Sequence, residues 1–388
     1  MKLGILTSHP IQYQAPLFRE LARQVDLTVY FAHRQTPEAQ AEAGFGVAFE
    51  WDVDLLSGYQ YEFLENVAQS PDTGRFFGCD TPSVRQRIAE GGFDAFLVMG
   101  WHLKCFWQAV FACQRAGVPV MVRGDSQLGT PRGRFKQALK RLLYPWILRQ
   151  FDGLLYVGQR NREYLEHYGA RADQLFFAPH CVDNNFFAAR AAEDDPVARR
   201  QSWGVQPSDR AVLFAGKLVE RKRPADLVRA LASLRAPGQP VIGVFAGDGP
   251  LRDVLTSLGQ ELQVPLIFLG FCNQMALPGI YAAADLLVLP SEGSETWGLV
   301  VNEAQACGTP CVVSDACGCA PDLASMAGVG LHYPVGQVAV MADVIHGLLK
   351  DVVSRPSAAV LRHIAHYDTL ETARGVQLAA KALGQSAT

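Results

Sequence analysis

Residues 289–321 read LPSEGSETWGLVVNEAQACGTPCVVSDACGCAP, and this stretch decides the fold. Residues 284–290, which overlap the start of this stretch, form an apolar run of strand length that ends at a proline, as a buried parallel strand does. A short turn at 296–299 leads into a predicted helix that begins near Leu299, and residues 311–314 form a second apolar run. The order strand, loop, helix, strand predicts an α/β sheet. Its loop and helix N-terminus lie at the carboxyl end of a strand, where open sheets of this kind bind ligands.

Two glutamates on either side of this turn suit a diphosphate that carries a sugar at each end. Glu295 lies in the loop, and Glu303 lies about two helical turns into the predicted helix. The N–H groups of Trp297, Gly298 and Leu299 would point out of the helix N-terminus, a favourable place for phosphate. Gly298 also lets the backbone approach a ligand closely, and carboxylates accept hydrogen bonds from sugar hydroxyls. The alternative is an exposed loop followed by an ordinary amphipathic helix, since glutamate pairs at one spacing are common by chance.

The wider string resembles a known signature. P-S-x-x-x-E-T-W-G-L-V-V-N-E-A-x-A-C-G-T-P-C-V-V-S-D, residues 290–315, is similar to the donor-site signature of the retaining family 4 glycosyltransferases, the group 1 enzymes with the GT-B fold. The chain departs from that signature in three ways. The loop before Glu295 is one residue longer, Trp297 replaces the usual phenylalanine, and Cys311 replaces a valine.

The resemblance implies an architecture of two Rossmann-like parallel-sheet domains that face each other across a cleft. Residues 1–190 would form the acceptor-binding domain and residues 191–365 the nucleotide-sugar-binding domain. Residues 366–388 would form a C-terminal helix that crosses back to the first domain.

The resemblance also implies an activity: retaining transfer of a sugar from a UDP- or GDP-sugar to a hydroxyl of a saccharide or lipid-linked acceptor. Such a reaction would serve bacterial polysaccharide, glycolipid or glycoconjugate biosynthesis. It would use no protein nucleophile, no cofactor and no metal. The alternatives are a nucleotide-sugar epimerase of the same fold and a non-catalytic protein that binds sugar nucleotides.

A second loop in this half carries two cations. A buried strand at 211–215 runs into Gly216, and Lys217 and Lys222 follow it. Two cations five residues apart can clamp a diphosphate and neutralise charge as the bond to the sugar breaks. The family motif is G-R-x-x-x-x-K, with Lys217 here in the arginine position. Taken alone, this loop would be solvated basic surface; the glutamate unit downstream favours a functional role. The resemblance further implies that Phe271 contacts the nucleobase.

The first half opens with a strand at 2–7 and a loop at 8–16 that lacks the G-x-G-x-x-G dinucleotide fingerprint. Related enzymes often carry a Gly-Gly pair in this loop, near the donor phosphates and the acceptor. His9 and Gln12 stand in a polar and aromatic loop instead. The alternative is a rigid turn shaped by its two prolines.

Two further strands end in polar residues that are candidates to line the cleft. His102 follows the strand at 93–99, and Arg123 and Asp125 follow the strand at 118–122. A histidine commonly follows the second of these strands in the family, touching the donor sugar near its reactive carbon. This chain has Arg123-Gly124-Asp125 there, so either Asp125 or His102 would take that role. For His102, a structural role is the alternative.

Segment 131–150 holds six basic residues and no acidic one. An apolar stripe at helical spacing runs along it, formed by Phe135, Leu139, Leu142, Leu143 and Trp146. The favoured interpretation is a helix packed on the core with solvated lysines and arginines. The alternative is a membrane-surface helix, or a groove for a phosphorylated lipid acceptor.

Residues 33–80 are irregular and polar, and we expect an inserted hairpin or flap there rather than a core unit. The string Asp52-Val53-Asp54 within them is interpreted as solvated.

Composition bounds the remaining possibilities. The chain has 388 residues, 49% hydrophobic and 19% charged, which suits a two-domain α/β protein. Its net charge of −3 gives no global attraction to nucleic acid. Without a signal peptide or a membrane-spanning run, the expected location is cytoplasmic, including the inner face of the membrane. Nine cysteines, an odd number in mostly apolar contexts, predict reduced and buried thiols, and their spacing matches no zinc motif.

Overall fold

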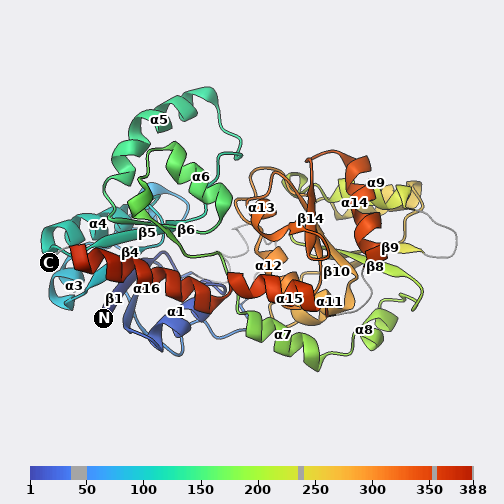
Figure 1. The fold of residues 1–388 in the computed structure, drawn as a ribbon, viewed down its shortest axis with the longest axis horizontal. Coiled ribbons are helices and arrows are strands. Elements are labelled where there is room, and N and C mark those ends of the chain that lie inside the picture. Colours follow the sequence, from blue (N-terminus) through green and yellow to red (C-terminus); the bar gives the residue numbers. More distant parts are fainter. Residues whose placement is uncertain (36–49, 235–239, 352–355, 387–388) are drawn as a thin grey trace.

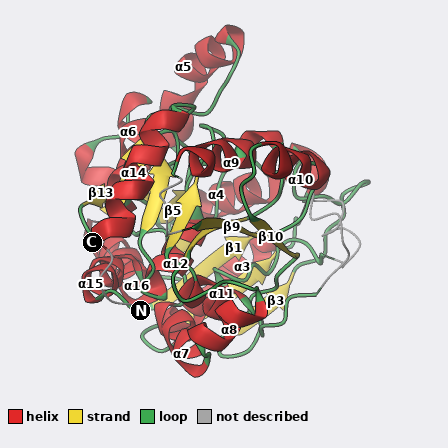
Figure 2. Ribbon diagram, turned by 90° about the vertical axis from the view of Figure 1, so that its right-hand side faces the viewer, coloured by secondary structure: helices red, strands yellow, loops and turns green. Residues whose placement is uncertain are grey.

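The computed structural model describes residues 1–35, 50–234, 240–351 and 356–386. Within these residues, alternating strands and helices build two seven-stranded sheets, one in each half of the chain (Figure 1). Helices lie on both sides of the strands (Figure 2). This arrangement confirms the predicted α/β architecture of two Rossmann-like domains.

The first sheet has the strand order β3-β2-β1-β4-β5-β6-β7, and all its pairs are parallel. Its strands are β1 (Lys2–Thr7), β2 (Asp26–Phe31), β3 (Gln60–Phe63), β4 (Ala95–Val98), β5 (Val120–Gly124), β6 (Gly153–Tyr156) and β7 (Leu175–Phe177).

The second sheet has the corresponding order β10-β9-β8-β11-β12-β14-β13, and only the β13–β14 pair among the described strands is antiparallel. Its strands are β8 (Arg210–Ala215), β9 (Val241–Ala246), β10 (Leu266–Gly270), β11 (Leu286–Leu289), β12 (Cys311–Ser314), β13 (Ser325–Met326) and β14 (Gly330–Tyr333). In both sheets the order reverses beside the first strand of the domain, so a crevice opens there at the carboxyl ends.

Each sheet is buried on both faces, because successive side chains of a strand point to opposite sides. Leu3 and Ile5 of β1 pack into one core and Leu6 into another. The α-helices of the described residues are α1 (Ala15–Ala22), α3 (Val84–Gly91), α4 (Lys104–Ala116), α5 (Arg134–Leu148), α6 (Gln159–His167), α7 (Asn184–Glu193), α8 (Pro196–Ser202), α9 (Pro224–Ser233), α10 (Arg252–Glu261), α11 (Leu277–Ala283), α12 (Leu299–Ala306), α13 (Ala320–Leu323), α14 (Val338–Asp351), α15 (Ala358–Ile364) and α16 (Thr369–Ser386).

The C-terminal helix crosses back to the first domain, as predicted. Ala373, Val376 and Ala379 of α16 are buried in the same core as β1 and α1. A Cβ atom on Gly375 would lie 2.0 Å from the Phe177 carbonyl oxygen, so the helix backbone packs directly against β7. In Figure 1, α16 runs along the N-terminal domain after α15 has passed the C-terminal one.

Two expectations about local structure are wrong. Part of the segment 33–80 belongs to the sheet: β3 pairs with β2 in parallel as its edge strand, and residues 36–49 lie outside the described part. The apolar stripe of segment 131–150 is not packed on the core, because all five of its side chains are exposed. Periodicity shows that a helix has an apolar face but not what that face contacts.

All nine cysteines are free thiols, and eight of them are buried. Within the described residues, no helix is both long and apolar enough to cross a membrane.

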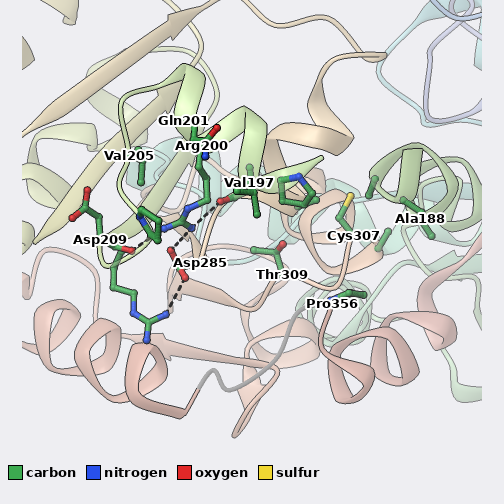
Figure 3. Close-up of a pocket in the computed structure, with 18 of the residues that line it drawn as sticks. Ala188, Val197, Arg200, Gln201, Val205, Asp209, Asp285, Cys307, Thr309 and Pro356 are labelled. Carbon is green, nitrogen blue, oxygen red and sulfur yellow. Dashed lines mark hydrogen bonds and ion pairs between the residues drawn. The ribbon is translucent and has the colours of Figure 1, made fainter. Parts of the chain in front are cut away.

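A buried carboxylate links two neighbouring strands in the centre of the second sheet, β8 and β11. Asp285, just before β11, is 1% exposed and accepts hydrogen bonds from Arg200 at 2.8 Å, Arg210 at 3.2 Å and the backbone N–H of Ala211 at 2.7 Å. Figure 3 shows Arg200 and Asp285 in the wall of a cavity of about 600 Å³ beside α7, α8 and α11. None of the predicted site residues lines this cavity.

We expect the Asp285→Ala variant to lose about 3 kcal/mol of unfolding free energy, because it removes the carboxylate that balances the largely buried charge of Arg200 and leaves that guanidinium, among the described residues, with only the Ala283 and Asp209 carbonyls. Urea unfolding measures the loss. The matched control is Glu166→Ala, which removes the exposed ion pair with Arg162 and should cost less than about 1 kcal/mol. Equal losses for the two variants would contradict a structural role for the buried carboxylate.

Candidate functional site

Two loops that follow adjacent strands bring a predicted cation and a predicted carboxylate together. β8 and β11 are neighbours in the sheet, so the loop at 216–222 adjoins the loop at 290–298. The Lys222 ammonium group contacts the Glu295 carboxylate, with side chains 12% and 15% exposed. The backbone N–H of Glu292 also donates to the Arg221 carbonyl at 3.0 Å. The structure therefore joins the two loops that the sequence singled out.

Lys217 lies near two other cations, Arg221 and Lys222. Partial burial lowers the pKa of its ammonium group, and the positive charges of Arg221 and Lys222 lower it further. Gly216, before it, has φ 141°. A side chain on Gly247, after β9, would place its Cβ 2.0 Å from the Gly216 carbonyl oxygen, so the two loops pack backbone against backbone. The result is a concentration of positive charge beside a glycine-lined backbone, an arrangement that attracts a polyanion.

Helix α12 presents its N-terminus at the same place. Gly298 begins it with φ 111°, and a Cβ there would lie 2.5 Å from Leu289, so only glycine fits. Within the described residues, the backbone N–H groups of Gly298 and Leu299 donate to no protein acceptor. These groups and the helix dipole favour a negatively charged ligand.

Glu303 lies deeper than the other carboxylate. It is 7% exposed, and the Tyr281 hydroxyl donates to its Oε2 atom at 2.6 Å. Burial raises the pKa of Glu303 to about 7, and the Tyr281 hydrogen bond opposes that rise. Within the described residues no contact joins Glu303 to Lys217, Lys222 or Glu295, and its other oxygen, Oε1, receives no hydrogen bond.

The first domain contributes a carboxylate to the donor-side loop. Asp125, after β5, accepts a hydrogen bond from the Thr296 hydroxyl at 2.7 Å. His180 places its Nε2 atom 4.0 Å from the same carboxylate, and the Tyr13 ring packs edge-on against the imidazole at 5.3 Å. Burial and Arg123 hold the pKa of His180 well below its usual range, so the ring is neutral near pH 7.

His102 follows β4 in the first sheet. Its ring packs against Phe106 at 5.6 Å, and partial burial lowers its pKa while Asp125 opposes that shift. His9 follows β1, and burial together with His33 lowers its pKa to about 4. Both imidazoles follow strands of the first sheet, as does His180, so this rim of the crevice carries neutral hydrogen-bonding groups at pH 7.

Arg123 has a different place from the one expected. It is buried, and its guanidinium donates to the Ala178 and Pro179 carbonyls at 3.2 and 2.7 Å. It thereby fixes the chain just before His180 instead of lining the cleft.

The domains are in direct contact around Gln127, a residue that the sequence did not indicate. Its buried amide nitrogen lies within hydrogen-bonding distance of the Glu295, Ala316 and Gly293 carbonyls, at 2.8, 3.1 and 3.2 Å. No motif surrounds Gln127. Its only sequence signal is its position two residues after Asp125.

Trp297 fills the same interface and is 3% exposed. Its Nε1 atom donates to Asn302 at 2.8 Å, and Asn302 donates to the His180 carbonyl at 3.1 Å. A Cβ on Gly158 of the first domain would lie 2.3 Å from the indole, so the ring packs against bare backbone. The Trp297 side chain therefore joins the domains, while its backbone lies beside the α12 N-terminus.

Phe271 follows β10 and is half-buried beside Gly270, which has φ 72°. The next residues contact the first domain: Asn273 donates to the Glu50 carbonyl at 2.8 Å, and the Met275 N–H donates to the Asp52 carboxylate at 3.2 Å. Asp52, interpreted as solvated, is thus exposed yet hydrogen-bonded across the domain boundary.

Among the described residues, no group of three or more metal-ligating side chains is arranged to hold a metal ion.

Comparisons with known proteins show the family and the fold of this chain. The family model described as "Glycosyl transferases group 1" matches residues 198–362, and the model described as "Glycosyl transferase 4-like domain" matches residues 10–180. The D-inositol 3-phosphate glycosyltransferase of Nocardia farcinica is 34% identical over 231 residues, which are 57% of this chain and 50% of that protein. The chain thus spans about half the length of such curated relatives.

Solved structures show the same fold. Anabaena HepE in complex with UDP is 20% identical, with a TM-score of 0.70 over 98% of this chain and 100% of that one. HepE in complex with UDP-glucose is also 20% identical, with a TM-score of 0.66 over 99% and 100% of the two chains.

We expect Gln127→Glu to open the domains, because it sets a carboxylate against three carbonyl oxygens in a buried place. Small-angle X-ray scattering would show a larger radius of gyration than for the wild type. The matched control is Gln260→Glu on exposed α10, which should leave the radius unchanged. An unchanged radius for both variants would mean that the Gln127 contact does not hold the domains together.

We expect Glu303→Gln to change how stability depends on pH. The folded pKa of about 7 lies above the ordinary value of 4.5, so the folded state favours the protonated acid. Its contribution is fully present below pH 4.5 and is lost as the pH rises to about 7. The neutral amide does not titrate, so the variant should gain stability relative to the wild type as the pH rises from 5 to 8, by about 3 kcal/mol.

Denaturation at several pH values measures this difference, with Glu261→Gln on the exposed end of α10 as the control. Parallel stability curves for wild type and Glu303→Gln would show that the acid is not held protonated.

Proposed function

Because this chain belongs to the group 1 glycosyltransferases, as a family 4-like protein with the GT-B fold, we propose that it transfers a sugar from a nucleotide-sugar to a hydroxyl group of an acceptor. The observation that carries the proposal is the contact between Lys222 and Glu295 at the N-terminus of α12. It unites a phosphate-binding charge and a hydroxyl-binding carboxylate in one place.

The donor diphosphate would lie between the cations and the helix N-terminus. Lys217 and Lys222 would neutralise the charge that develops on the leaving phosphate, and the N–H groups of Gly298 and Leu299 would donate to it. Such interactions accelerate the reaction to the extent that they strengthen in the transition state. These ammonium groups supply the positive charge, so the proposal includes neither a metal ion nor a resident cofactor.

The two carboxylates would hold the sugars on either side of the diphosphate. Glu295, beside Lys222, would accept hydrogen bonds from the transferred sugar. Glu303 would bind the ribose through Oε1, since Oε2 is occupied by Tyr281. Phe271 would contact the nucleobase. The HepE complexes with UDP and UDP-glucose support a uridine nucleotide, and a GDP-sugar is the alternative.

The reaction would retain configuration. The bond from the anomeric carbon to the phosphate oxygen breaks, and the acceptor oxygen bonds to the same face of that carbon. The acceptor proton passes to the departing phosphate, and the nucleoside diphosphate leaves, so no protein nucleophile is needed. Asp125 would take the place of the usual histidine near the reactive carbon, because it faces the donor loop through Thr296; His102 is the second choice. Domain closure would exclude water and suppress hydrolysis.

The acceptor would be a saccharide or a lipid-linked molecule in polysaccharide, glycolipid or glycoconjugate biosynthesis. The nine free thiols support a cytoplasmic location, and peripheral contact through residues 131–150 would place the protein at the inner face of the membrane.

We expect Lys222→Ala to lower kcat by about 10²- to 10³-fold, as loss of one transition-state contact does, with a smaller change in donor affinity. Glu303→Ala should instead weaken donor binding about tenfold or more, because it removes a hydrogen bond to a charged group. A thermal-shift screen of UDP-, GDP- and TDP-sugars first identifies the donor, since a bound donor raises the melting temperature. Calorimetry and turnover assays then separate affinity from rate.

Lys381→Ala on exposed α16 is the matched control and should retain full activity. Unchanged affinity and activity in both site variants would remove the assignment. Donor conversion without an acceptor would favour the epimerase, and donor binding without turnover in any acceptor mixture would favour the non-catalytic protein.

A further inference from the structure

Helix α5 stands out from the first domain with little of it packed. Only Leu148, in its last turn, is buried. Figure 1 and Figure 2 both show the helix projecting beyond the rest of the molecule. A helix of 15 residues is marginal in water without a packed face. This length and exposure indicate that α5 has a partner.

One side of α5 carries large apolar side chains that are exposed to solvent. They recur at positions i, i+4, i+7, i+8 and i+11, and they form what we call the α5 stripe: Phe135 (81% exposed), Leu139 (44%), Leu142 (76%), Leu143 (44%) and Trp146 (56%). The stripe continues onto α4, where Trp146 stacks on Trp107 and Trp107 packs against Phe111, itself 44% exposed. Contiguous exposed apolar surface of this kind marks an interaction site.

Basic residues border the stripe. Segment 131–150 carries six arginines and lysines and no acidic residue, in a chain whose net charge is −3. Arg134, Lys136 and Arg141 are exposed, and they form no ion pair within the described part of the chain. An apolar face bordered by long basic side chains is the pattern of a helix that lies in a membrane interface.

A hollow of about 440 Å³ lies along the N-terminal part of the helix. Arg132, Lys136 and Lys140 line it together with Leu139, Leu143 and Tyr144. Lys140 is fixed there, since its ammonium group lies 4.6 Å from the centre of the Tyr144 ring and donates to the Tyr164 hydroxyl at 3.1 Å. Three cations above apolar walls suit the phosphate of a lipid whose chains run along the stripe.

The hollow is close to the candidate site along the chain. Gln127 contacts the Glu295 carbonyl, and the Gly129 carbonyl oxygen lies 2.2 Å from the position of a Cβ on Gly293. Three residues after Gly129, Arg132 lines the hollow. A surface that holds α5 therefore also lies near the cleft between the domains.

We propose that the α5 stripe and its basic border dock on an anionic lipid surface, with a lipid phosphate in the hollow. This gives the membrane contact of the proposed function a defined set of residues. A second copy of the chain is the less suitable occupant, because two α5 helices side by side would bring together two segments of six positive charges each.

The test is cosedimentation of the full chain with vesicles of phosphatidylcholine alone and of phosphatidylcholine with phosphatidylglycerol. We expect binding to the anionic vesicles only, weakened by added salt. The variant Arg134→Glu/Lys136→Glu/Arg141→Glu should lower the partition coefficient on the order of a hundredfold or more. The variant Phe135→Ser/Leu142→Ser should lower it at least tenfold.

Each variant has a matched control on the surface elsewhere. Lys350→Glu/Arg362→Glu/Lys381→Glu reverses three exposed charges, and Val254→Ser/Leu378→Ser changes side chains 56% and 58% exposed. Both controls should bind as the wild type does. Circular dichroism checks that all four variants are folded, and the readout does not require transfer activity, so it stands apart from the test of the proposed function.

Three results would overturn the proposal: no binding of the wild type to anionic vesicles, equal binding to neutral vesicles, or unchanged binding of the charge-reversal variant. Sedimentation velocity adds a fourth: a dimer of the wild type that becomes a monomer in Phe135→Ser/Leu142→Ser would assign the stripe to a second copy.

Discussion

The contact of one buried amide with the backbone of the opposite domain determines how the two halves of the crevice meet. Gln127 has two N–H groups and three carbonyls within reach, all in the segment that carries Glu295 or in the turn after β12. The Glu295 carbonyl also accepts from the Gly318 N–H at 3.0 Å, whereas the Gly293 and Ala316 carbonyls have the buried Gln127 amide as their donor among the described residues. The same closure sets Asp125 against Thr296 and Trp297 against Gly158. The two sides of the crevice are therefore held in register by contacts that need no ligand.

The charges in the crevice show what the ligand must supply. Burial and the positive charges of Arg221 and Lys222 lower the pKa of Lys217, and Glu295 forms an ion pair with Lys222. A diphosphate would relieve this repulsion. On the other side of α12, burial raises the pKa of Glu303 and makes its ionised form costly. A ribose hydroxyl donating to it would lower that cost. The cluster of cations and the buried Glu303 would thus both be more stable with a ligand bound than without one, as expected of a preorganised site.

The sequence was sufficient for the fold and for the donor-side loops because these depend on local patterns. Apolar runs bounded by glycine and proline gave the strands, and the spacing around Gly298 gave the helix N-terminus. The edge strand β3 was missed because its residues, QYEF, are half polar and partly exposed, and they lack the apolar run of a central strand. The outward direction of the α5 stripe could not be predicted either, since an apolar face has the same period whether it meets a core or water. Gln127 and the burial of Trp297 depend on contacts between residues more than 100 positions apart, for which a single sequence carries no signal.

The segment between β5 and α5 connects the first domain, the loop at 290–298 of the second domain and helix α5. It has no regular secondary structure at 125–127 and turns at 128–130. Asp125, Gln127 and Gly129 all meet the donor loop. Between them, Ser126 turns back to its own domain, where its carbonyl accepts from Asn161 at 2.7 Å. A few residues later the chain enters α5. The N-terminus of α5 is thus linked by a short, hydrogen-bonded run to the residues that close the crevice. Because this run is held at several points, the orientation of the helix and the closure of the domains should be coupled, and the surface that α5 contacts would help to decide which acceptors reach the donor.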